Sequence, residues 1–229
     1  DVAPSRGLGD VYKRQQIYNA VDSMIVGRFV GANALAAVGS TGTIMFMVLG
    51  ASTGLSTGFT VLTSQRFGIS DEKGTRQSVA NGILLSVLLI IVMTLLSLLC
   101  MKKVLALMNT PEDIFADAYS YISVICMGIV ASVAYNYFAA CLRAIGNSKV
   151  PLVTLVFSAC LNVVLDLFFI IKMNMGVAGA AWATNIAQGV SALLCVLYIL
   201  KKEPVLCPEV SQIRFYKDDT HKQLAVGIP

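Results

Sequence analysis

Two carboxylates in this chain lie within long apolar segments, where an acidic side chain is costly. Asp166 lies in the run from Leu152 to Ile171, which holds no other charged residue. An ionised carboxylate near the bilayer centre costs about 2.5–3.5 kcal/mol on insertion scales, so such a residue usually has a function. Asp22 is the second acid of this kind, whereas the remaining acids fall in expected loops, in the linker or near the N-terminus. We therefore expect Asp22 and Asp166 to bind a proton or a cation.

Two polar residues would complete a cluster around these acids. Asn162 precedes Asp166 by four positions, so both project from one helix face. With a rise of ~1.5 Å per residue, Asp166, Thr184 and Asp22 lie about 9, 10 and 12 Å below the outer ends of their segments. If the three helices face one another, the four side chains form one site. Carboxylate, amide and hydroxyl oxygens suit Na⁺ or a proton. The alternative for Thr184 is a hydrogen bond to its own helix backbone.

The composition excludes a water-soluble domain. The 229 residues are 56% hydrophobic and 13% charged, with a mean hydropathy of +0.75, whereas soluble domains are roughly 25% charged. A net charge of +4 suits loops that face anionic lipid and gives no nucleic-acid patch. The six cysteines lack C-x-x-C spacing, so we interpret them as small buried apolar residues. No enzyme motif is present, so we expect no enzyme and no cofactor beyond a coupling ion.

Six apolar segments predict an all-α membrane protein with a six-helix transmembrane bundle. They lie at about 15–31, 36–63, 78–100, 118–141, 152–171 and 177–200, and a spanning helix needs ~20 residues. The alternation over ~10-residue units that is typical of a barrel is absent. Residues 201–223 are polar and are expected to form a linker that contains a short amphipathic helix at Ile213 to Leu224, and residues 224–229 to begin a further, truncated helix. Residues 1–14 differ from the rest, and we expect a non-native or disordered leader there.

Lysine and arginine predict the orientation in the membrane. The loops after the second and fourth segments, together with the stretch after the sixth, hold ten of these residues, and the opposite loops hold four. Basic residues are retained on the cytoplasmic side. We therefore expect a multi-pass protein of the cell membrane, plasma or inner, with the linker and both ends in the cytoplasm.

Other polar residues are weaker candidates for the lining of a substrate cavity. Gln15 and Tyr18 lead into Asp22, and Tyr121 and Asn136 lie in the fourth segment. For each of them, ordinary packing or a position at the membrane interface is an equally good explanation.

Several motifs resemble those of the multidrug and toxic compound extrusion (MATE) transporters. In chain order they are Tyr18–Asp22 with Val26-Gly27, Ala34–Gly39, Leu142–Pro151, Asn162-x-x-x-Asp166 and Gly176–Thr184. The resemblance implies one lobe of a twelve-helix transporter whose two six-helix lobes are related by a pseudo-twofold axis. This chain would be the N-terminal lobe. It also implies that Asp22, Asn162, Asp166 and Thr184 form the lobe's sodium or proton site, with Tyr121 lining it.

The implied function is cation-coupled antiport, driven by protons or sodium, that exports organic and cationic drugs or metabolites. Its partners would be this substrate, the lipid bilayer and the C-terminal lobe, with no nucleic acid. A lipid-linked oligosaccharide flippase of the same superfamily is an alternative, although it would place Lys or Arg in its cavity and none lies deep in a segment here. A non-transporting membrane scaffold also stays open. It predicts that Asp22→Ala and Asp166→Ala leave cellular function intact.

Overall fold

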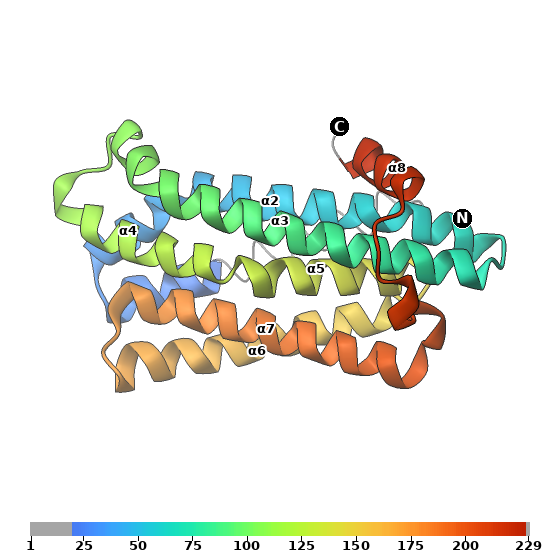
Figure 1. Ribbon diagram of the computed structural model, residues 1–229. Coiled ribbons are helices and arrows are strands. Elements are labelled where there is room, and N and C mark those ends of the chain that lie inside the picture. The colour runs from blue at the N-terminus through green and yellow to red at the C-terminus, as the bar shows by residue number, and fades with distance from the viewer. Residues whose placement is uncertain (1–19, 228–229) are drawn as a thin grey trace.

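The computed structural model describes residues 20–227, and every regular element among them is a helix (Figure 1), so the all-α fold is confirmed. A first helix is described over residues 20–29. It is followed by α2 (Ala32–Gly68), α3 (Glu72–Leu107), α4 (Glu112–Met127), α5 (Ile129–Ala144), α6 (Lys149–Leu167), the π-helix η1 (Phe168–Lys172) and α7 (Gly176–Lys202). Two 3₁₀ turns, η2 (Pro204–Leu206) and η3 (Val210–Gln212), lead to α8 (Lys217–Gly227).

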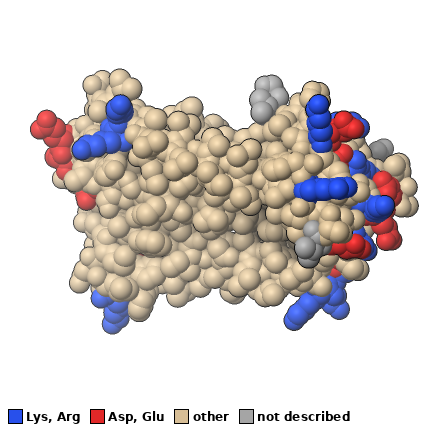
Figure 2. Space-filling view, viewed as in Figure 1, with Lys and Arg blue, Asp and Glu red and all other residues tan. Residues whose placement is uncertain are grey.

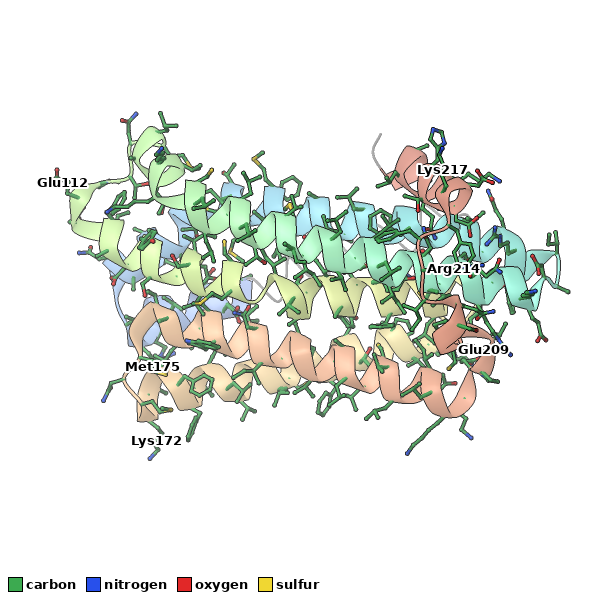
Figure 3. All side chains as sticks on the ribbon, viewed as in Figure 1. Glu112, Lys172, Met175, Glu209, Arg214 and Lys217 are labelled. Atoms are coloured by element: carbon green, nitrogen blue, oxygen red, sulfur yellow. The ribbon has the colours of Figure 1, made fainter. Side chains whose placement is uncertain are left out.

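The long helices lie side by side in one bundle, with their connections at its two ends (Figure 1). Glu112, Lys172 and Met175 mark one end, which we call the α4 end, and Glu209, Arg214 and Lys217 mark the α8 end (Figure 3). Charged side chains gather at these two ends on the face shown in Figure 2, with a band free of them between. This distribution is that of a bundle whose middle lies in hydrocarbon.

Within the described residues, α2, α3, the stretch Lys149–Lys172 and α7 are long and apolar enough to cross a membrane. The pair α4 and α5 qualifies as a fifth span, bent by 46°. The expected first segment, 15–31, lies partly outside the described residues, and its helix ends at residue 29 before Gly31 (φ 126°). A φ of this sign favours glycine because a side chain would clash with the backbone.

Most helices extend beyond the apolar segments from which they were predicted. α3, for example, begins at Glu72 rather than at residue 78, because the side chain of Asp71 accepts a hydrogen bond (2.9 Å) from the backbone N–H of Gly74. The expected span over 118–141 is divided into α4 and α5, because the helix breaks at Gly128.

The apolar side chains that face outward match a lipid environment. Met47, Val153 and Leu99 are 68%, 67% and 76% exposed. The interpretation of the cysteines as buried is correct for Cys126, Cys141 and Cys195 and wrong for Cys160, which is exposed. The other two, Cys100 and Cys207, are partly buried. The helix that carries Cys160, α6, turns its apolar face outward and buries a polar one.

The segment after α7 differs in part from the predicted linker and truncated helix. A short helix was expected at Ile213 to Leu224, and α8 begins at Lys217 and extends to Gly227, so it includes the start of the expected truncated helix. Asp218 and Asp219 lie in its first turn, where acidic side chains stabilise a helix N-terminus. Residues 1–14, 228 and 229 lie outside the described residues.

Buried polar contacts fasten α8 to α2 and α3. Both guanidinium Nη atoms of Arg66 donate to the carboxylate of Asp219, at 2.7 and 2.6 Å. Asn81 donates to the side chain of Gln223 (2.7 Å), which donates in turn to the carbonyl oxygens of Phe59 (2.8 Å) and Ser78 (2.9 Å). We call Arg66, Asn81, Asp219 and Gln223 the α8 network. It fixes α8 as part of this bundle.

Candidate functional site

The fold brings Asp22 and Asp166 into contact. Asp22 comes from the first described helix and Asp166 from the last turn of α6, and their carboxyl groups lie close enough to interact electrostatically. Asp22 is 6% exposed and Asp166 is fully buried. Two ionised carboxylates this close repel each other, and a proton or a cation between them would remove that repulsion.

Thr184 of α7 links the acids to an amide. Its hydroxyl has two acceptors in reach, Oδ2 of Asp22 at 3.4 Å and the carbonyl oxygen of Ala180 at 3.0 Å. Asn162 donates to the same hydroxyl at 3.3 Å. A hydroxyl group carries one proton, so Thr184 can donate to only one of its two acceptors at a time. Both expectations for Thr184, a bond to an acid and a bond to its own helix, are therefore represented.

One oxygen of the acid pair has no donor. Oδ1 of Asp166 is buried and accepts no hydrogen bond from any donor group among residues 20–227. Buried polar atoms nearly always have a partner, and this oxygen is able to accept a further hydrogen bond or to coordinate a cation. We call Asp22, Asn162, Asp166 and Thr184 the carboxyl cluster.

The helix α6 positions this cluster by burying a polar face. Apart from Pro151, its buried residues are Thr154, Ser158, Asn162 and Asp166, at four-residue spacing. Directly after Asp166 the helix changes to the π-helix η1, a local widening that is frequent at functional sites. The sequence interpretation missed Thr154 and Ser158, although the four-residue period of polar residues was visible in the apolar run.

The weaker candidates for the cavity lining differ in their outcome. Tyr121 of α4 is 3% exposed and lies close enough to both acids to interact electrostatically with them. Asn136 lies beyond the break, in α5, is partly buried and is not among the groups that contact the cluster. Gln15 and Tyr18 lie outside the described residues.

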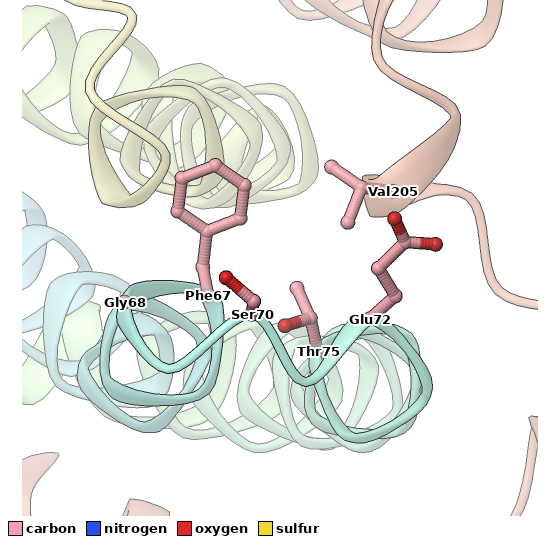
Figure 4. Close-up of a pocket in the computed structure, with 6 residues that line it drawn as sticks. All are labelled: Phe67, Gly68, Ser70, Glu72, Thr75 and Val205. Carbon is pink, nitrogen blue, oxygen red and sulfur yellow. The ribbon is translucent and has the colours of Figure 1, made fainter.

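A separate pocket of about 370 Å³ lies at the α8 end, next to the turn between α2 and α3 (Figure 4). Its lining residues are Phe67, Gly68, Ser70, Glu72, Thr75 and Val205. It holds a single acid and none of the carboxyl-cluster residues. The pocket lies at the α8 end, whereas the connection between η1 and α7 lies at the α4 end (Figure 1). Since Asp166 comes shortly before η1, the pocket is separate from the carboxyl cluster.

Known proteins resemble this chain in sequence. A family model described as MatE matches residues 14–168. The probable multidrug resistance protein YpnP of Bacillus subtilis is 33% identical over 83% of this chain and 43% of its own length. The probable multidrug resistance protein YoeA of the same organism is 28% identical over 94% of this chain and 48% of its own. The chain thus spans less than half the length of these relatives.

The structural comparison agrees. An inward-facing multidrug resistance MATE transporter superposes with a TM-score of 0.86 at 25% identity, covering 94% of this chain and 49% of that one. An outward-facing one superposes with a TM-score of 0.87 at the same identity, covering 95% and 48%. The bundle therefore corresponds to one lobe of such a transporter. With the family match over most of its length, this chain belongs to the MATE family of transporters.

Proposed function

We propose that this chain is the N-terminal lobe, with its membrane bundle at 15–200, of a cation-coupled antiporter that exports organic, cationic compounds. Asp22 and Asp166 bind the coupling proton or sodium ion. The observation that carries the proposal is the contact of two buried carboxyl groups beside the acceptor Oδ1 of Asp166, which no donor satisfies. A positive charge or a proton is what this arrangement lacks.

The residues of the cluster would have separate roles in the exchange. Asp22 and Asp166 share the incoming proton or sodium ion. Asn162 holds the hydroxyl of Thr184 by donating to it. When Asp22 is ionised, Thr184 donates to it, and when the coupling ion satisfies Asp22, Thr184 donates to the carbonyl oxygen of Ala180. The cluster thus has two hydrogen-bonded states, and the coupling ion selects between them.

The charges of the lobe support a cationic substrate. Its two deeply buried acids within the spans have no Lys or Arg beside them, because these residues lie near helix ends in the described part of the chain. Substrate and coupling ion would therefore be attracted by the same carboxylates and compete for them. No observation in the described residues favours the flippase or the scaffold.

Export would require a second lobe, and the relatives are about twice the length of this chain. The lobe resembles inward-facing and outward-facing transporters almost equally, with TM-scores of 0.86 and 0.87. This near-equality supports a lobe that moves as one body against its partner. In the proposed orientation the α8 end, with Arg66, Lys73 and Lys217, faces the cytoplasm.

Export of a tracer cation from vesicles that carry this lobe in its complete transporter tests the proposal. Asp166→Asn keeps the size of the side chain but removes the charge, so we expect it to abolish ion-driven export. Asp117→Asn is the matched control, because Asp117 is an exposed acid on α4. Ion-driven export by Asp166→Asn at the rate of the control would overturn the proposed role of the cluster.

A further inference from the structure

Asn185, next to Thr184 in α7, contacts the joint between α4 and α5. It is 9% exposed, and its side-chain Nδ2 donates to the carbonyl oxygen of Val124 at 2.6 Å. Val124 lies in the last turn of α4, which ends at Met127. α5 begins at Ile129, and the two helices meet at 46°. A side chain from a distant part of the sequence therefore bonds to the backbone where this span breaks.

Gly128 provides the space for this contact. A Cβ atom at Gly128 would overlap the side-chain amide of Asn185, whose Oδ1, Cγ and Nδ2 are the atoms nearest to that position. The backbone N–H of Gly128 also points at the carbonyl oxygen of Val124, at 3.1 Å. The side chain of Asn185 thus fills the space that a side chain at position 128 would need. Its Nδ2 and the backbone N–H of Gly128 both donate to the carbonyl oxygen of Val124. A sharp bend in a helix has an identifiable cause, and here it is an inserted side chain at a glycine.

The joint and the carboxyl cluster are connected through two short segments. On α4, Tyr121 lies one turn before Val124 and interacts with both acids. On α7, Thr184 reaches Asp22 and its neighbour Asn185 reaches Val124. Successive helix residues point about 100° apart, so one turn of α7 contacts the cluster on one side and the joint on the other.

We propose that Asn185 is a positioning residue that couples the occupancy of the carboxyl cluster to the bend at Gly128. The proposal rests on the proposed function of the cluster. When the hydroxyl of Thr184 moves between Asp22 and the carbonyl oxygen of Ala180, the adjacent residue of α7 shifts with it. Asn185 transmits this shift to the carbonyl oxygen of Val124, and the angle between α4 and α5 follows. Tyr121 then approaches or leaves the acids as the span bends.

Hydrogen exchange of the 229-residue chain tests this coupling at the joint. The backbone N–H groups of Ala131 and Ser132 bond to the carbonyl oxygen of Gly128 and form the first turn of α5. We expect sodium ions or a change of pH to alter the exchange of a peptide across this turn in the natural protein. In Asn185→Ala the response is lost. In the same variant, the ion concentration that gives half of the maximal change in Trp182 fluorescence should shift at least about fivefold. This is the lower end of typical coupling between two sites.

Ser191→Ala is the matched control, because Ser191 of α7 donates to the carbonyl oxygen of Thr154 and contacts α6 rather than the joint. It removes a bond of the same kind, so a purely structural role of Asn185 predicts the same result for both variants. Gly128→Ala should destabilise the chain by overlap with Asn185, and the double variant Gly128→Ala with Asn185→Ala should fold again, since the amide is gone. The rescued double variant should still lack the response at the joint.

The outcomes separate this inference from the proposed function. If Asp166→Asn still gives the full ion response, the cluster is not the ion site and the proposed function fails. If Asp166→Asn abolishes the response, but the peptide at the joint still responds in Asn185→Ala, the cluster is the ion site and the coupling through Asn185 is refuted.

Discussion

The carboxyl cluster and the α8 network are both buried, polar and built from helices far apart in the chain, yet they are matched in opposite ways. In the α8 network a cation meets an anion, an amide meets an amide, and no buried side-chain nitrogen or oxygen atom lacks a partner. In the carboxyl cluster an acid meets an acid, and Oδ1 of Asp166 has no donor among residues 20–227. The first arrangement favours one state, whereas the second changes with the proton or ion that it holds.

The distances support this contrast. The hydrogen bonds among the four side chains of the α8 network measure 2.6–2.7 Å, typical of strong or charge-assisted bonds. Those of Thr184 to Asp22 and of Asn162 to Thr184 measure 3.4 and 3.3 Å, near the limit for a hydrogen bond. Longer bonds are weaker, so they can be exchanged for others at low cost.

The largest loss of stability is expected from Asp219→Ala. It leaves the guanidinium group of Arg66 without its carboxylate in a site where the two side chains are only 20% and 6% exposed. We expect the free energy of unfolding to fall by about 2–4 kcal/mol, somewhat less than for a fully buried pair. Thermal unfolding in detergent measures it. Asp218→Ala, which removes the exposed neighbouring acid, is the control. An equal loss of stability in both variants would show that the contact between Arg66 and Asp219 does not stabilise the fold.

Gln223→Leu should cost less, about 1–3 kcal/mol, because it leaves the side-chain Nδ2 of Asn81 without an acceptor. Adding Asn81→Leu removes that unpaired donor, so part of the stability should return. The recovery is incomplete, since Oδ1 of Asn81 also accepts from the backbone N–H of Tyr216 and the hydroxyl of Thr220. The same unfolding measurement decides it, and strictly additive losses would argue against a network.

Asp166→Asn should change stability by no more than about 1 kcal/mol, in either direction. It removes one of two like charges, and the repulsion that disappears offsets the polar contact that is lost. Thermal unfolding gives the change in stability, and the export assay on the same variant gives the change in activity. A loss as large as that of Asp219→Ala would place the carboxyl cluster among structural networks and contradict the contrast between the two regions.

The smallest effect on stability is expected from Thr184→Val, which keeps the shape but removes the hydroxyl. In an ion titration, the concentration of the coupling ion that gives half of the maximal signal should shift about fivefold. This shift is equivalent to the loss of one hydrogen bond of about 1 kcal/mol. Thr184→Ser retains the hydroxyl and should stay near the natural value. If Thr184→Val leaves the half-maximal concentration unchanged, the hydroxyl does not contribute to ion binding.

The parts of this structure that depend on local pattern were predictable from the sequence. The apolar segments predicted the helical bundle, and helix spacing with depth along the segments placed Asp22, Asn162, Asp166 and Thr184 together. These inferences succeed because a bilayer imposes one direction and one scale on every segment. The depth of a polar residue therefore carries information about its neighbours on other helices.

The break at Gly128 and the contacts that hold α8 against α2 and α3 were not predictable in this way. A glycine within an apolar segment is compatible with a straight helix, and the amide that contacts this one, from Asn185, lies far along the chain. Residues 217–223 are polar and lie in the expected linker, and the groups that hold them, Arg66 and Asn81, belong to distant helices. Both cases involve long-range polar contacts, which leave no periodic signal.

Ion binding by the 229-residue chain tests the central claim most directly. Trp182 is the only tryptophan and lies two residues before Thr184 on α7, so its fluorescence is a probe of the helix that carries Thr184. Titration with sodium ions, with potassium as control, and with acid should give a saturable change for one coupling ion in the natural chain and in Asp117→Asn. It should give none in Asp22→Asn or Asp166→Asn. An unchanged titration in these two variants would contradict the assignment of the carboxyl cluster as the coupling site.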